Sequence, residues 1–115
     1  MKIEPFANLL GANLRGAELP CSFRIKDIHS RLFEVASQPG ALDMARWHTC
    51  ETTHCRAGWV VHLAGDAGRI MEQLLSTPTA AALIYAASDP ELAKIPDFYA
   101  TNDEAMADIK RLAGV

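Results

Sequence analysis

The chain has 115 residues, of which 50% are hydrophobic and 22% charged, a balance that predicts one globular domain rather than a disordered chain. Its formal net charge is −3 and its basic residues are spread along the sequence, so we expect no nucleic-acid partner. No window approaches the roughly eighteen apolar residues of a membrane span, which argues against a membrane partner. The N-terminal residues lack the apolar run of a signal peptide, and the three cysteines are an odd number. We therefore expect reduced thiols and a cytoplasmic location.

Residues 7–19 repeat with a period of five. Each unit has a small residue, a polar residue and then a leucine, which makes Leu9, Leu14 and Leu19 equivalent. This segment resembles pentapeptide-repeat proteins, whose units wind a four-sided β-solenoid with the central leucine inside. Two and a half units cannot close one turn of that solenoid, and solenoids are stable only when neighbouring turns bury each other. The segment is a remnant, a capping edge or an extended arm, unless its period arose by chance.

We predict that residues 1–20 form this pentapeptide-repeat-like or extended arm, and that residues 21–115 form a helical domain. Leu9, Leu14 and Leu19 are the candidate partner-binding residues, because so short a segment cannot cover them itself. They are expected to pack either against the helical body or against a second copy of the chain. The second arrangement would make a homodimer through the arm.

The apolar spacing after the arm predicts an all-α domain of about five helices. The first begins near Lys26 and ends before Pro39. Thr77 and Pro78 are the expected N-cap and first residue of a later helix, and residues 89–91 repeat that pattern for a single turn. A capping box of Thr101 with Glu104 opens the last helix. Residues 21–25 alternate like a short strand.

Residues 46–65 hold three of the four histidines, two of the three cysteines and both tryptophans. Thr52 and Thr53 are natural N-caps, so we predict a helix over 54–64. Its apolar residues lie on nearly every side, which predicts a buried central helix. Three of its residues are expected in the structural core: Trp59, Leu63 and Gly58. Gly58 inside a helix also predicts close approach by another backbone segment.

Four possible metal ligands fall within eight positions of this stretch: His48, Cys50, His54 and Cys55. The residue types suit a tetrahedral zinc site, but the usual spacing is two pairs separated by a dozen or more residues. We expect these side chains to pack and hydrogen-bond without a cofactor. A zinc-stabilised domain is retained as the alternative.

Cys55 is also a candidate nucleophile, because a cysteine in the first turn of a helix can be stabilised as a thiolate. The base would be His48 or His54. Burial near Trp59 would instead raise the pKa of the thiol, so we expect no enzyme activity and keep a thiol enzyme as a second alternative. A disulfide between Cys50 and Cys55 is sterically possible but disfavoured in the cytoplasm.

The motif Cys50-x-Thr52-Thr53-His54-Cys55-x-Ala57-Gly58-Trp59 resembles a small all-α domain of uncharacterised function in proteobacterial and bacteriophage-type proteins, some of which carry pentapeptide-like repeats. Glu51 stands where a small residue is expected. The resemblance implies a bacterial or phage setting, and it implies no catalytic residues. The sequence therefore predicts a non-enzymatic accessory or inhibitor-type module that binds another protein or itself.

Overall fold

The computed structural model describes residues 24–115. The predicted arm, with Leu9, Leu14 and Leu19, lies outside the described residues, as does most of the strand-like segment 21–25. The described chain forms five helices and one two-stranded hairpin, which confirms the all-α prediction. In chain order these elements are α4 (Ile28–Ala36), β1 (His48–Cys50), β2 (Thr53–His54), α5 (Arg56–Leu63), α6 (Gly65–Leu74), α7 (Thr77–Ser88) and α8 (Asn102–Ala113).

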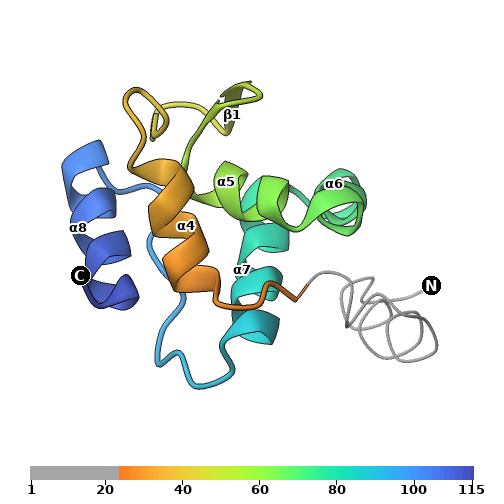
Figure 1. Ribbon diagram of the computed structural model, residues 1–115. Coiled ribbons are helices and arrows are strands. Elements are labelled where there is room, and N and C mark those ends of the chain that lie inside the picture. Colours follow the sequence, from red (N-terminus) through yellow and green to blue (C-terminus); the bar gives the residue numbers. More distant parts are fainter. Residues whose placement is uncertain (1–23) are drawn as a thin grey trace.

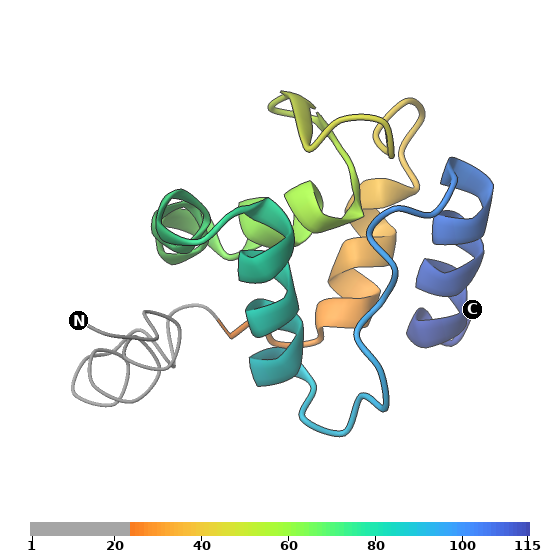
Figure 2. The same ribbon diagram turned by 180° about the vertical axis from the view of Figure 1, so that it is seen from behind.

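Helix α5 lies at the centre, where it contacts α4, α6 and α7 (Figure 1). Helix α8 packs on α4 at one end of the molecule, and α6 packs on α5 and α7 at the other. The segment that joins α7 to α8 runs up between these two helices on the back (Figure 2). The hairpin of β1 and β2 sits above the N-terminal end of α5 (Figure 1).

The predicted central helix is buried, but it begins two residues later than expected. Every residue from Arg56 to Val61 is buried. Residues 53 and 54 belong to β2 instead: the His54 amide donates to the Ala41 carbonyl, and the His54 carbonyl accepts from the Asp43 amide. Because these pairings hold the backbone extended, the helix begins only at Arg56. Its N-cap is Cys55, whose sulfur accepts the Gly58 amide at 3.3 Å, and not Thr52 or Thr53.

The N-terminal caps predicted for two other helices have different outcomes. The capping box of Thr101 and Glu104 is present at α8, with both of its reciprocal hydrogen bonds. At α7 the N-cap is Ser76 rather than Thr77, which becomes the first helical residue ahead of Pro78. The single turn predicted at residues 89–91 is present as a hydrogen-bonded turn and not as a helix, with the Leu92 amide donating to the Asp89 carbonyl at 3.1 Å. There the Asp89 carboxylate accepts the Glu91 amide and closes a local turn.

Two buried glycines let backbone segments meet. A Cβ on Gly58 would lie 1.8 Å from the Trp47 carbonyl oxygen, so the close approach predicted at Gly58 is present. A Cβ on Gly68 would lie 2.4 Å from the Val61 carbonyl oxygen, which brings α6 directly onto α5. Between the two helices, Gly65 has a φ of +69°, a conformation that side chains with a Cβ rarely adopt. These contacts hold the segment before the hairpin and helix α6 directly against α5.

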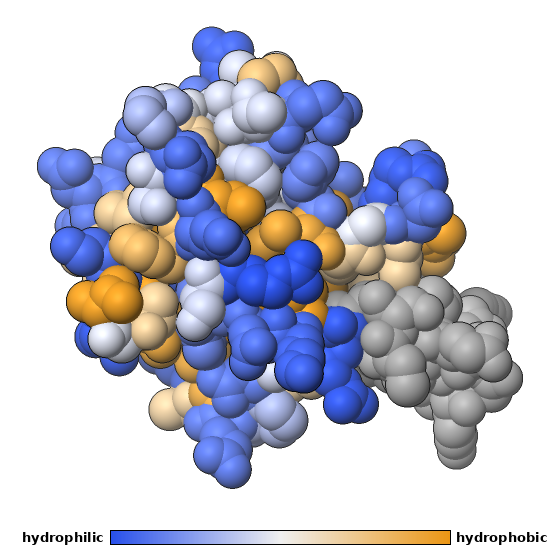
Figure 3. Space-filling model, in the orientation of Figure 1, coloured by the Kyte–Doolittle hydropathy of each residue, from blue (hydrophilic) through white to orange (hydrophobic). Residues whose placement is uncertain are grey.

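Most of the surface in Figure 3 is polar, with apolar side chains scattered over it. The large apolar side chains exposed in the described chain are Ile70, Leu74, Ile95, Tyr99 and Val115. Two of them, Ile70 and Leu74, are one turn apart on α6. None of the described helices has both the length and the apolar character needed to cross a bilayer.

Candidate functional site

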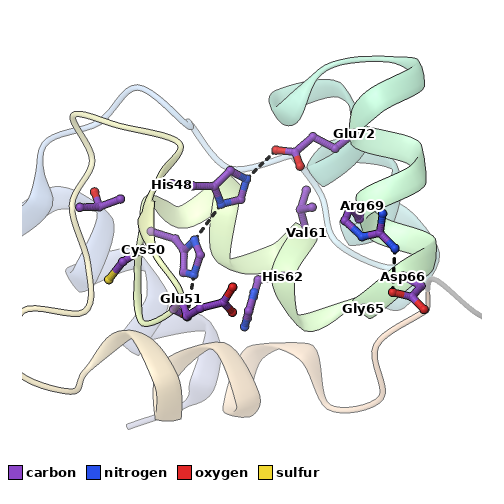
Figure 4. Close-up of a pocket in the computed structure, with 11 residues that line it drawn as sticks. His48, Cys50, Glu51, Val61, His62, Gly65, Asp66, Arg69 and Glu72 are labelled. Carbon is purple, nitrogen blue, oxygen red and sulfur yellow. Dashed lines mark hydrogen bonds and ion pairs between the residues drawn. The ribbon is translucent and has the colours of Figure 1, made fainter.

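A cleft of about 770 Å³ opens between the hairpin, the end of α5 and helix α6 (Figure 4). Its polar lining gathers side chains that are distant in sequence. They include His48, Glu51, His54, His62, Arg69 and Glu72. Three of the four histidines of the chain therefore border one cavity. The strand pairing explains the closest contact, because His48 of β1 lies opposite His54 of β2 in the antiparallel register.

His48 links the hairpin to α6. Its Nδ1 lies 2.7 Å from Nδ1 of His54, and its Nε2 lies 2.6 Å from Oε2 of Glu72. The same carboxylate oxygen accepts the Thr77 hydroxyl at 2.6 Å, which fixes Glu72 from the start of α7. Figure 4 shows the His48 ring lying between its two partners. Its side chain is 36% exposed, so the ring borders solvent as well.

His54 is held far more firmly. The residue is 3% exposed, and its Nε2 lies 3.0 Å from the Glu51 carbonyl oxygen. Its ring meets Trp59 edge-on, with centroids 4.5 Å apart, and stacks on His62 at 4.7 Å. Together with the backbone hydrogen bonds of β2, these contacts leave the ring one orientation. The buried Trp59 takes part in the same support, because its indole N–H donates to the Ala41 carbonyl at 2.7 Å.

Burial lowers the pKa of His54 below its ordinary value. The carbonyl of Glu51 and its carboxylate act in the opposite direction, while the neighbouring His62 and His48 lower the pKa further. The neutral imidazole is therefore the stable form of His54. A neutral ring carries one N–H and one lone pair, and the carbonyl of Glu51 can only accept. The N–H is thus on Nε2, and the lone pair on Nδ1 points at His48.

The hydrogen bonds of His48 can be read in the same way. Its Nε2 lies against the Glu72 carboxylate, and its Nδ1 lies against the lone pair of His54. Two lone pairs cannot face each other across 2.7 Å, so the contact between the two Nδ1 atoms is a hydrogen bond with one hydrogen between them.

The two cysteines of the motif are not part of this group. Cys50 is exposed, and its thiol contacts the Thr52 hydroxyl at 3.5 Å, pointing away from the histidines (Figure 4). Cys55 is buried, with its sulfur turned to the Gly58 amide. Both are free thiols, so no disulfide joins them. Within residues 24–115, no three His, Cys, Asp or Glu side chains are grouped to hold a metal ion, and the four-ligand zinc set is not assembled.

The thiol pKa values do not favour Cys55 as a nucleophile. Burial raises the pKa of Cys55 above its ordinary value and outweighs the hydrogen bonds from the first turn of α5. Hydrogen bonds from Thr52 and Thr53 lower the pKa of the exposed Cys50. The more acidic thiol is thus the one that faces away from the imidazoles, and a cysteine–histidine pair is not formed.

A second polar set, overlooked at the level of sequence, centres on Arg56. This arginine is 1% exposed. Its Nε donates to the Tyr85 hydroxyl at 2.9 Å, and its Nη1 lies 2.8 Å from the Asp108 carboxylate. The set ties α5 to α7 and α8. Nη2 has no hydrogen-bond partner among the described residues.

Sequence reasoning brought His48 and His54 together as candidate ligands but could not supply Glu72. The two histidines are six residues apart on either side of a turn, a spacing that a hairpin can bring face to face. Glu72 lies eighteen residues after His54, on a separate helix, and no spacing rule points to it. No protein family, curated protein or solved structure matches this chain.

Proposed function

We propose that this protein is a non-enzymatic binding module that associates with a second copy of itself through the outer face of α6. The observation that carries the proposal is the exposure of two large apolar side chains one turn apart. Ile70 is 43% exposed and Leu74 is 60% exposed. Water-exposed apolar pairs of this kind are stabilised when a partner covers them.

Helix α6 already uses its inner face. Ala67, Gly68 and Met71 are buried against α5 and α7. Ile70 and Leu74 are only partly covered by the described fold, and they give α6 apolar side chains outside this inner face as well. Figure 3 shows apolar surface at the α6 end of the molecule. An outer apolar face on a helix that also packs inward is typical of a helix at an interface.

The chain itself contains an apolar segment that could cover the outer face of α6. Leu9, Leu14 and Leu19 precede the described part, which starts at Arg24 and is held by the Ile25 amide donating to Ser88 at 2.8 Å. Ser88 ends α7, whereas Leu74 lies just before its start, about 18 Å away along a twelve-residue helix. Leu14 lies ten positions before Arg24, a stretch that spans up to about 35 Å when extended, so this leucine is within reach of α6.

The pentapeptide-like pattern favours a second copy over the chain's own body. Two and a half units from each of two chains give five units, and by the resemblance four units complete one solenoid turn. A two-fold arrangement would let both arms and both α6 faces be buried together. No catalytic group supports an enzyme as strongly, because the buried Cys55 thiol lacks a base and both ring nitrogens of His48 are engaged.

Size-exclusion chromatography with light scattering tests this proposal on the full chain. The expected result is a dimer that dissociates in Ile70→Ser/Leu74→Ser and, separately, in Leu9→Ser/Leu14→Ser/Leu19→Ser. The matched control is Ile95→Ser, which removes an exposed isoleucine of similar exposure far from α6. Circular dichroism of each variant checks that the helices remain.

Any of three results would overturn the proposal. A strict monomer at every concentration removes self-association altogether. A dimer that persists in the α6 variant places the interface elsewhere. Dissociation by the arm substitutions alone would also count against α6, because the two surfaces are proposed to cover each other.

A further inference from the structure

We propose that His48 and His54 form a binding site for a divalent transition-metal ion such as zinc, held by their two Nδ1 atoms with the remaining coordination positions open to the cleft. This inference does not depend on the α6 interface. It differs from the zinc set expected from sequence, because it uses neither Cys50 nor Cys55.

The Nε2 atoms of both rings already have the hydrogen-bond partners that are usual for metal-binding histidines. A histidine that binds a metal through one nitrogen usually donates its other N–H to a carboxylate or a backbone carbonyl, which fixes the tautomer and the ring orientation. His48 donates Nε2–H to Glu72, and His54 donates Nε2–H to the Glu51 carbonyl. Each ring therefore presents its Nδ1 to the other.

The two Nδ1 atoms, one from each ring, can share either a proton or a metal ion. With both Nε2 atoms protonated, the two Nδ1 atoms face each other across 2.7 Å and share one proton. A metal ion replaces that proton and releases it to solvent. Zn–N bonds of about 2.0–2.1 Å in a tetrahedron place the two nitrogens about 3.3 Å apart. With His54 fixed, the His48 ring, whose side chain is 36% exposed, has to swing aside so that its Nδ1 moves by about 2 Å off the line along which the two nitrogens now face each other.

The charges around the cleft favour a cation. Three carboxylates line it, those of Glu51, Asp66 and Glu72. The one arginine in the lining, Arg69, already pairs with Asp66 at 3.0 Å. Neutral imidazole with oxygen ligands suits zinc, nickel and copper ions, and the order of affinity for such a site is expected to place copper above nickel and zinc. Water molecules in the cleft complete the coordination.

Metal titration of the full-length protein, stripped with chelator, tests the inference with Zn²⁺ and Co²⁺ as probes. We expect one equivalent of zinc to bind and to raise the melting temperature, since an ion that binds only the folded state stabilises it. Cobalt should give visible ligand-field bands without a sulfur-to-metal charge-transfer band. His48→Gln should abolish measurable binding, and its exposed side chain makes loss of folding no concern.

Two further variants separate this site from other histidines and thiols. Glu72→Gln removes the carboxylate behind His48 and should weaken zinc binding by about 10–100-fold. His29→Gln changes a histidine that pairs with Asp89, remote from the cleft lining, and should bind zinc like the wild type. Cys50→Ser should also leave the affinity unchanged.

The inference is overturned by any of three results: no zinc bound by the wild type, wild-type affinity in His48→Gln, or a thiolate charge-transfer band with cobalt. The readouts are independent of oligomeric state. A monomer that binds zinc through His48 would reject the proposed interface and retain this site.

Discussion

The two polar sets beside α5 differ in how completely the protein encloses them. Arg56 is buried among Tyr85 and Asp108, inside the contact of three helices. His48 and Glu72 face a cleft that remains open. An enclosed polar set contributes to the fold, because removing one member leaves the others without partners. An open set can exchange its contacts with solvent, so it is available for a ligand.

The largest expected effect tests the enclosed set. Arg56→Ala leaves a cavity in the core and deprives the buried Tyr85 hydroxyl of its donor. We expect the free energy of unfolding to fall by about 3–5 kcal/mol, measured by urea denaturation. The control is Arg111→Ala, which removes an exposed arginine that pairs with the same Asp108 and should cost at most about 1 kcal/mol. Equal losses in the two variants would show that burial of Arg56 is not what matters.

The next largest effect is expected for Gly58→Ala. Gly58 lies where α5 contacts the segment that leads into the hairpin. The new Cβ would lie 1.8 Å from the Trp47 carbonyl oxygen, so the segment before β1 has to move. We expect a loss of about 3 kcal/mol in urea denaturation, despite the higher helix propensity of alanine. Gly114→Ala is a useful contrast, because nothing lies within 4 Å of its Cβ and only its φ of +80° is strained. A Gly58→Ala protein as stable as the wild type would contradict the close contact.

A smaller effect follows from Asp108. Burial raises the pKa of this carboxyl, but hydrogen bonds and charge from Arg111 and Arg56 outweigh it and hold the pKa below its ordinary value of 3.8. A lowered carboxyl pKa in the folded state means stability that is present above pH 3.8 and lost as the pH falls through the folded value. Asp108→Asn should therefore cost about 1 kcal/mol at neutral pH.

The difference in the free energy of unfolding between Asp108→Asn and the wild type should shrink as the pH drops below 3.8. Urea denaturation of both proteins between neutral and acidic pH measures it. A difference that stays constant with pH would mean that the charge of Asp108 contributes nothing and that only its hydrogen-bond geometry matters.

The smallest expected effect belongs to the open set. His48→Gln should change the free energy of unfolding by less than about 1 kcal/mol in the absence of metal, because a partly exposed ion pair contributes little. Thermal denaturation without added ions checks this value. A loss comparable to that of Arg56→Ala would reverse the comparison and make the cleft part of the core.

The fold was largely predictable because its helices carry local signals. The capping box at Thr101 and the apolar spacing along α4 can be recognised without knowledge of the tertiary structure. The start of α5 was wrong by two residues, since the pairing of His54 with residues 41 and 43 overrides the capping preference of Thr52 and Thr53. The turn predicted after Ser88 is present but does not become helical, since the Asp89 carboxylate accepts the Glu91 amide and closes the chain locally.

The candidate site was predictable only in part. Sequence spacing collected His48 and His54 but grouped them with two cysteines whose side chains point elsewhere. Glu72 and Arg56 were missed for different reasons. Glu72 reaches the site through the packing of α6, and Arg56 looks like a surface residue until the positions of Tyr85 and Asp108 are known.

The two glycine contacts beside α5 also determine how the cleft meets a ligand. At Gly58 and Gly68, backbone touches backbone with no side chain between them, so neither wall can shift without breaking a helix contact. The cleft is therefore preformed, and little ordering entropy is lost when it is filled. In nuclear magnetic resonance, a ligand entering it should perturb signals around His48 and Glu72 while those of α4 and α8 stay in place.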